Sequence, residues 1–110
     1  MNKLNKSKIN NLNGYINSIV ENLKVNYNPK KIILFGSYSN GTFSKDSDID
    51  LLIVKKTKKH SIWRRVEARK ASRTKIPIDI LVYTPAEIKK LQKEKSFFIM
   101  DILENGKVLY

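Results

Sequence analysis

Residues 32–54 read IILFGSYSNGTFSKDSDIDLLIV and contain two apolar runs joined by a polar segment rich in glycine, serine and asparagine. The runs, Ile32–Phe35 and Leu51–Val54, are short and aliphatic and are bounded by turn residues, which is typical of buried strands. The stretch therefore predicts two strands of a sheet with a polar connector between them. Both ends of that connector carry residue types suited to a binding or catalytic site.

The first end of the connector is Gly36-Ser37, and the second is the pair Asp48 and Asp50. Residues 37–40 are expected to form a short helix or turn, and a Gly-Ser pair that leaves a strand and enters such a helix offers free backbone N–H groups and a helix dipole to a phosphate. Alternate residues of a strand face the same way, so the two carboxylates share one face. Carboxylates at the start of an apolar strand are costly unless a cation compensates them. The pattern predicts a phosphate and metal site, although both aspartates could simply be turn and strand-start residues.

Helix signals flank this stretch on both sides. Residues 7–27 predict an amphipathic helix, because apolar residues recur at spacings of three and four until Pro29 follows it. Thr84, Pro85 and Glu87 have the spacing of a capping box with proline in the first turn, and they predict another helix start.

The remaining elements complete a small domain. The expected strands are Lys31–Phe35, Asp48–Val54 and Pro77–Tyr83, the expected helices are 61–73 and 96–104, and a terminal run at Lys107–Tyr110 could add to the sheet. This order predicts an α/β (α+β) fold with a small mixed sheet flanked by helices. With room for one core only, residues 1–110 are expected to form a single domain.

Several apolar side chains outside the strands are assigned to the core. They are Tyr15, Tyr27, Ile62, Val66, Phe97, Phe98 and Met100. Ile62 and Val66 lie four residues apart, so both are expected on the inward face of their helix, and Ala68 and the stem of Arg69 could face inward with them. The cluster at residues 97–100 fits either core or a subunit contact, and core is favoured. Trp63 is expected to cover the edge of the core or a partner surface.

The composition limits the classes of protein that the chain can be. It has 110 residues, 41% of them hydrophobic, and no cysteine, which excludes a disulfide framework and a thiolate metal site. No apolar run approaches the roughly 20 residues needed to span a bilayer. The first residues are charged and lack the apolar region of a signal peptide. These features predict a cytoplasmic protein with no membrane partner.

The charge is strongly positive and uneven. The net charge is +12, and residues 55–75 hold ten lysines or arginines against one glutamate, a net charge of +9 for this window. Such a field attracts polyanions, whether nucleoside triphosphate, RNA or an acidic protein face. The abundance of lysine and asparagine throughout the chain leaves a second possibility open, that the window is only a solvated surface.

Other phosphate and metal chemistries lack their residues. Gly36 and Gly41 have the separation of a Walker-type loop, but Thr42 and Phe43 stand where lysine and serine or threonine are required. His60 is the single histidine, so histidine zinc sites and Ser-His-Asp catalysis have no adequate set of residues. An exposed loop position is expected for His60.

Two-metal phosphoryl transfer remains. It needs two cations about 3.5–4 Å apart, and Mg²⁺ prefers carboxylate oxygens. Asp48 and Asp50 can bridge both ions, and Asp79, from the strand Pro77–Tyr83, can complete the ion that activates a hydroxyl. Gly36 lets the backbone approach phosphates, and Ser37 offers its N–H and hydroxyl to them. The alternative for Asp79 is a strand-edge or paired carboxylate.

This arrangement resembles the nucleotidyltransferase superfamily of the DNA polymerase beta type, in particular its minimal members. The signature of that family is Gly-Ser, ten residues, Asp-x-Asp, and a third acidic residue on a later strand. Here Gly36-Ser37 is followed by ten residues and then by Asp48-Ile49-Asp50, and Asp79 falls where the third carboxylate belongs. The resemblance implies Asp48, Asp50 and Asp79 as catalytic metal ligands for two Mg²⁺ ions, with Gly36 and Ser37 binding the nucleotide.

The resemblance also implies a biological role. Minimal members of this length resemble antitoxins encoded beside a HEPN-domain ribonuclease toxin, in which AMP moves from ATP to a tyrosine hydroxyl of the toxin. The basic region 55–75 is then a candidate partner-facing surface. Two alternatives stay open. One is nucleotidyl transfer to another acceptor, such as an RNA end or an aminoglycoside, and the other is a non-enzymatic antitoxin that acts by binding.

Overall fold

A computed structural model of the chain describes the backbone of residues 3–36 and 49–110 and the side chains of residues 13–36 and 49–110. Its elements are α1 (Lys3–Tyr27), β1 (Lys31–Phe35), β2 (Ile49–Val54), α3 (Ser61–Ser72), β3 (Ile78–Tyr83), α4 (Pro85–Lys93), α5 (Phe97–Asn105) and β4 (Lys107–Val108). Every helix and strand expected in the described part of the chain is present, and α1 begins four residues earlier than expected. The short helix expected over residues 37–40 lies outside the described residues.

The four strands form one mixed sheet in the order β3-β2-β1-β4. β1 is antiparallel to β2 and to β4, whereas β2 and β3 are parallel and are connected through α3. A parallel pair needs such a crossover, because the chain must return to the same end of the sheet before the second strand begins. The terminal run at Lys107 does add to the sheet, as expected. The α/β fold with a mixed sheet flanked by helices is therefore confirmed.

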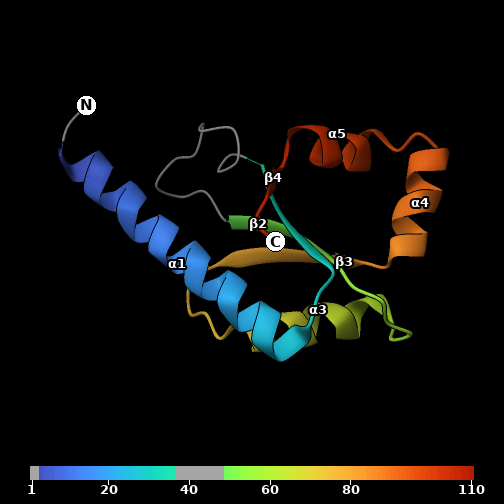
Figure 1. The fold of residues 1–110 in the computed structure, drawn as a ribbon, viewed down its shortest axis with the longest axis horizontal. Helices are drawn as coiled ribbons and strands as arrows, with labels where there is room; N and C mark the ends of the chain where they lie inside the picture. Colours follow the sequence, from blue (N-terminus) through green and yellow to red (C-terminus); the bar gives the residue numbers. More distant parts are fainter. Residues whose placement is uncertain (1–2, 37–48) are drawn as a thin grey trace.

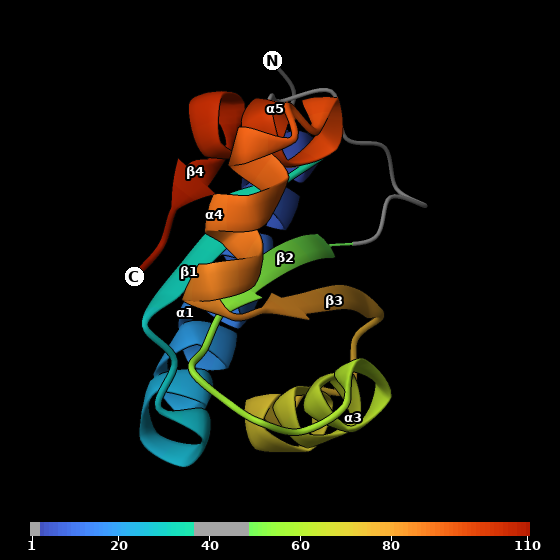
Figure 2. The same ribbon diagram turned by 90° about the vertical axis from the view of Figure 1, so that its right-hand side faces the viewer.

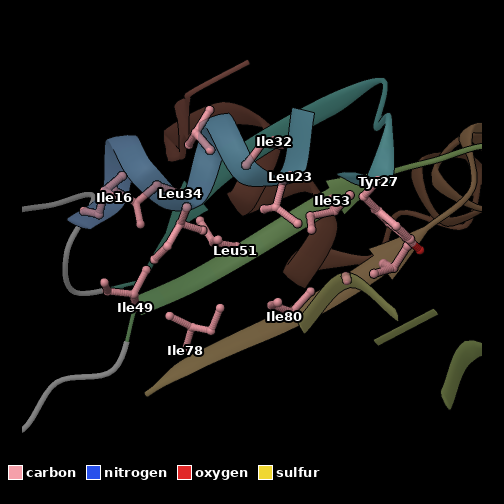
Figure 3. Close-up of a cluster of buried hydrophobic side chains, with 14 residues drawn as sticks. Ile16, Leu23, Tyr27, Ile32, Leu34, Ile49, Leu51, Ile53, Ile78 and Ile80 are labelled. Atoms are coloured by element: carbon pink, nitrogen blue, oxygen red, sulfur yellow. The ribbon is translucent and has the colours of Figure 1, made fainter. Parts of the chain in front are cut away.

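Helices cover both faces of the sheet. α1 and α3 lie on one side, and α4 and α5 lie on the other (Figure 1; Figure 2). Alternate strand residues point to opposite faces, so the sheet supplies a core on each side. The core under α1 and α3 includes Ile32, Leu34, Ile49, Leu51, Ile53, Ile78 and Ile80 from the strands and Ile16, Leu23 and Tyr27 from α1 (Figure 3). The core under α4 and α5 is smaller and includes Ile33, Leu52, Val54, Ile88, Ile99 and Ile102.

The inward face of α3 agrees with the expected one at Ala68 but differs from it at Ile62 and Val66. Ile62 and Val66 are 64% and 38% exposed, whereas Ala68 and Ser72 are fully buried. α1 lies across this small-residue face and donates hydrogen bonds from Asn22 Nδ2 to the Ser72 carbonyl, at 2.9 Å, and from Asn26 Nδ2 to the Ala71 carbonyl. Small side chains allow this close approach, which turns the larger aliphatic residues outward. The assignment of Ile62 and Val66 to the core was wrong.

The apolar cluster on α5 also lies largely outside the core. Phe97 is 88% exposed, Phe98 50% and Met100 44%, so their assignment to the core was wrong. A helix of nine residues on a sheet buries only one stripe, which here is Ile99 and Ile102. Phe98 still packs edge-to-face against Phe35 of β1, with ring centroids 5.9 Å apart.

The two expectations for tyrosines of α1 had opposite outcomes. Tyr27 is buried, as expected, whereas Tyr15 is 52% exposed, so its assignment to the core was wrong. Tyr27 joins α1 to α3 by donating a hydrogen bond to the Arg64 carbonyl at 3.3 Å. Burial raises the pKa of the Tyr27 phenol to about 12, with a further rise from the charge of Glu67 and an opposing effect from Arg64.

α4 begins with the expected capping box. The Thr84 hydroxyl accepts from the Glu87 N–H, and the Glu87 carboxylate accepts from the Thr84 N–H. The same carboxylate binds the Arg64 guanidinium of α3 at 2.6 Å. Burial alone would raise the pKa of Glu87, but the hydrogen bonds from Thr84 and Arg64 and the charge of Arg64 outweigh it and lower the pKa. Within residues 3–36 and 49–110, no helix is long and apolar enough to cross a membrane.

Replacing Glu87 by Gln is expected to lower the free energy of unfolding at neutral pH and to leave little difference in acid. A group with a lowered pKa in the folded state stabilises the fold above its unfolded value, ordinarily 4.5, and this stability is lost as pH falls through the lower folded value. Urea unfolding of both proteins over a range of pH measures the difference. Glu94→Gln is the matched control, because Glu94 has only a 3.9 Å ion pair with Lys90. If the difference in the free energy of unfolding between Glu87→Gln and the wild type stayed constant as the pH was lowered, it would contradict this account.

Candidate active site

A row of side chains crosses the sheet at the end where β1 finishes and β2 and β3 begin. Phe35 is the register partner of Asp50 on β2, and Asp50 is the register partner of Asp79 on β3. Directly paired residues of neighbouring strands project from the same face, so all three side chains lie on the face that α4 and α5 cover further along. Asp50 is half-buried and Asp79 is exposed. Asp79 therefore lies on the strand next to that of Asp50, as its predicted role beside Asp50 requires.

The first residue after β1 lies against this row. Gly36 has φ +75°, a conformation that favours glycine, and an added Cβ would overlap Asp50 Oδ2 and lie 3.3 Å from Asp50 Cγ. A side chain at position 36 would therefore displace the carboxylate. Glycine is required here both by its backbone angle and by its close approach to Asp50.

Two of the predicted site residues, Ser37 and Asp48, lie outside the described residues. Among the residues that the structure describes, no group of three acidic, histidine or cysteine side chains is close enough to hold a metal. The described part of the site thus consists of Gly36, Asp50 and Asp79, and the roles assigned to all five residues stay predictions.

The donor set nevertheless fits the predicted Mg²⁺ ions. Asp50 and Asp79 place two carboxylates side by side on one face of the sheet, and like charges in this position are unfavourable unless a cation lies between or beside them. Carboxylate oxygens are the hard ligands that Mg²⁺ prefers. Because Gly36 approaches Asp50 closely, the backbone of residue 36, rather than a side chain, lies beside the Asp50 carboxylate.

A hollow of about 260 Å³ lies beside Asp79, between α3 and the outer edge of β3. It is lined by Ile62, Arg65, Val66, Arg69, Ile78, Asp79 and Ile80. The helical members are spaced at three and four residues, so they form one face of α3. The sequence pattern did identify part of this face, through the spacing of Ile62 and Val66, but the inference that it points into the core was wrong.

The basic window 55–75 is not one continuous free surface. Four of its ten cations make contacts with other residues that the structure describes. Arg64 binds Glu87, Lys59 binds Glu67 at 2.5 Å, Arg69 donates to the Ile78 carbonyl at 2.9 Å, and Lys55 lies over the Tyr27 ring at 4.3 Å. His60 is exposed, as expected, and its side chain accepts from the Ile62 N–H at the start of α3. Part of the basic window therefore supports the fold.

The sequence and the fold both match known proteins. Residues 17–110 match the family described as polymerase beta, nucleotidyltransferase. A protein of Methanocaldococcus jannaschii named "Putative protein adenylyltransferase" is 54% identical over 41 residues, which are 36% of this chain and 41% of that protein. The chain thus aligns with about two fifths of the length of this curated relative.

A crystal structure of a "putative nucleotidyltransferase" from Sulfolobus solfataricus has a TM-score of 0.56 at 24% sequence identity, and the likeness covers 70% of each chain. At this identity the likeness concerns the fold alone, and it agrees with the predicted nucleotidyltransferase fold. The family match extends from within α1 through β1, β2 and β3 to the last residue. The chain belongs to the polymerase beta nucleotidyltransferase family, as its Gly-Ser and Asp-x-Asp pattern predicted.

Proposed function

We propose that this protein is a Mg²⁺-dependent nucleotidyltransferase that moves AMP from ATP to a hydroxyl group of another protein. The main support is the register pairing of Asp50 with Asp79, which puts two carboxylates beside the backbone of Gly36 on one face of the sheet. The choice of a protein acceptor is supported by the name of the Methanocaldococcus jannaschii relative, a protein adenylyltransferase.

The finer assignment rests on the resemblance to minimal nucleotidyltransferases. In this assignment the acceptor is a tyrosine of a HEPN-domain ribonuclease toxin, and the protein is its antitoxin. The reaction forms a bond between the tyrosine oxygen and the α-phosphorus of ATP. It breaks the bond from that phosphorus to the oxygen that bridges to the β-phosphorus. Pyrophosphate leaves with the electron pair of the broken bond, and the tyrosine loses its proton.

Each site residue has a part in this reaction. Asp48 and Asp50 would hold Mg²⁺, with Asp79 completing the ligand set on the side of the acceptor. When bound, the metal lowers the pKa of the attacking hydroxyl and offsets the charge of the triphosphate. Gly36 brings the backbone close to the phosphates, and Ser37 donates hydrogen bonds to them. Asp79 is exposed, so an incoming hydroxyl can reach its carboxylate, which orients that hydroxyl and accepts its proton.

Labelled ATP tests the proposal. The protein is incubated with Mg²⁺ and the product of its neighbouring gene, using ATP labelled on the α-phosphate and, separately, on the γ-phosphate. We expect the α-label to appear on the acceptor protein and the γ-label to appear in pyrophosphate only. Asp79→Asn should abolish the transfer. Asp101→Asn should not, because Asp101 is an exposed residue of α5 that only accepts a hydrogen bond from Asn105.

The other possible results separate the alternatives. The γ-label on the acceptor would show a kinase reaction and contradict the proposal. Label on added RNA, with none on protein, would change the acceptor class but keep the reaction. Neutralisation of the toxin by the Asp79→Asn variant, without any transfer, would show that the protein acts by binding.

A further inference from the structure

We propose that the hollow between α3 and β3 is the docking groove for the acceptor, and that it takes an extended, acidic protein segment with aliphatic side chains. The groove is the one lined by Ile62, Arg65, Val66, Arg69, Ile78, Asp79 and Ile80. This inference rests on the proposed function, since it concerns the partner of that site. It is carried by four features of the groove: its backbone edge, its aliphatic wall, its charge and its position.

The first feature is the outer edge of β3, which is the last strand of the sheet on this side. The Tyr83 carbonyl accepts from Lys55, which follows β2, so the backbone groups of Ile78, Ile80 and Val82 point the other way, toward α3. Figure 2 shows α3 lying along this edge.

Arginines of α3 donate hydrogen bonds to the carbonyls at the two ends of this edge but not to the carbonyl in its middle. Arg69 donates to the Ile78 carbonyl at 2.9 Å and Arg64 to the Val82 carbonyl at 3.5 Å. Within the described part of the chain, no hydrogen bond reaches the outward backbone groups of Ile80, which lines the groove. Backbone groups that lack hydrogen-bond partners favour a ligand that supplies such partners. An extended peptide supplies them by adding a strand to the sheet.

The second feature is the aliphatic wall of the groove. Ile62 and Val66 are on the same face of α3 and are substantially exposed. Exposed apolar side chains grouped beside a hollow mark interaction sites more often than isolated ones do. Their branched aliphatic character suits apolar side chains of a protein. Nucleobases bind mainly by stacking on aromatic rings, and none of the described residues that line the groove is aromatic.

The third feature is charge. Arg65 and Arg69 both line the groove, and the surrounding window 55–75 has a net charge of +9. Arg69 is held by the Ile78 carbonyl, whereas Arg65 is exposed on the wall. A segment with aspartate or glutamate flanking its aliphatic residues complements this field and is steered toward it.

The fourth feature is position. Asp79 lines the groove and also belongs to the carboxylate row with Asp50. The Asp79 side chain projects from the face opposite to α3, so a segment docked along the edge of β3 runs past Asp79, and its hydroxyl must reach around this edge to the carboxylates. The groove thus links recognition of the acceptor to its modification.

Peptide selection tests this proposal without relying on catalysis. Displayed random short peptides, and in parallel a random RNA pool, are selected on the full-length wild-type protein in the absence of ATP. We expect peptides rich in acidic and aliphatic residues to be enriched. Their dissociation constants should rise about tenfold for Arg65→Glu and several-fold for Ile62→Asn. Two matched controls, Lys70→Glu on α3 outside the groove and Val25→Asn on α1, should bind like the wild type.

The same measurements define failure. Selected peptides that bind Lys70→Glu as poorly as Arg65→Glu would show a nonspecific charge effect and overturn the proposal. The absence of enriched peptides, or enrichment of RNA whose binding depends on Arg65, would also overturn it. Asp50→Asn should still bind the peptides, because it changes the site and not the groove. If the wild-type protein bound the peptides but had no transfer activity, this result would overturn the proposed function alone.

Discussion

The substitution Asp50→Asn is expected to lower the rate of nucleotidyl transfer about a thousandfold, a loss typical of removing a central electrostatic group from an active site. The Asp50→Asn side chain keeps the size and shape of the original, so it fits beside the Gly36 backbone. It lacks the charge that would hold Mg²⁺ next to Asp79 in the proposed site. Transfer of α-labelled AMP to the acceptor measures the effect.

Binding of Mg²⁺ and ATP gives a second measurement for Asp50→Asn. Ligands that bind the folded state raise its unfolding temperature, so Mg²⁺ with ATP should stabilise the wild type. The variant should lose most of this increase while keeping its circular dichroism spectrum. Asp101→Asn on α5 is the control and should respond like the wild type. If the Asp50→Asn variant transferred AMP at a normal rate, Asp50 could not be a metal ligand of this reaction.

The substitution Gly36→Ala is expected both to destabilise the protein and to reduce the rate of AMP transfer about a hundredfold. The left-handed backbone at Gly36, with φ +75°, costs an L-residue roughly 1–2 kcal/mol. In addition, the new Cβ would overlap Asp50 Oδ2, so either the carboxylate or the end of β1 must move. Thermal unfolding and AMP transfer measure the two effects separately.

Gly14 provides a matched control for this substitution. A Cβ added at Gly14 meets nothing within 4 Å, because the residue lies on the exposed face of α1. Gly14→Ala is therefore expected to stabilise the protein by about 0.5–1 kcal/mol through its higher helix propensity. It should leave transfer unchanged. Full activity of Gly36→Ala would mean that the close approach of residue 36 to Asp50 is not needed for the reaction.

Local signals in the sequence predicted most of the elements and the composition of the site. The capping box at Thr84 and Glu87 depends on neighbours three residues apart, and the structure contains both of its hydrogen bonds. The apolar strand runs and the amphipathic first helix were found for the same reason. Such features depend on residues that are close in the sequence, so they can be predicted without knowing which elements pack against them.

Errors arose where burial depends on a partner element. Ile62 and Val66 form a real helical face, but α1 packs on the opposite, small-residue face of α3 through Ala68 and Ser72. Phe97 and Met100 were misplaced for a similar reason, since α5 buries Ile99 and Ile102 instead. Apolar periodicity indicates that a helix has an apolar face. Only packing against other elements decides which face of the helix is buried.

The sequence by itself determined the family, the α/β class and the residue types of the site, because Gly36-Ser37, Asp48, Asp50 and Asp79 appear in a specific order and spacing. Only the tertiary structure decided that β3 lies beside β2 with Asp79 in register with Asp50, and that α3 leaves a groove open at the outer edge of β3. Strand order and register depend on contacts between residues far apart in the chain, and no local pattern encodes them.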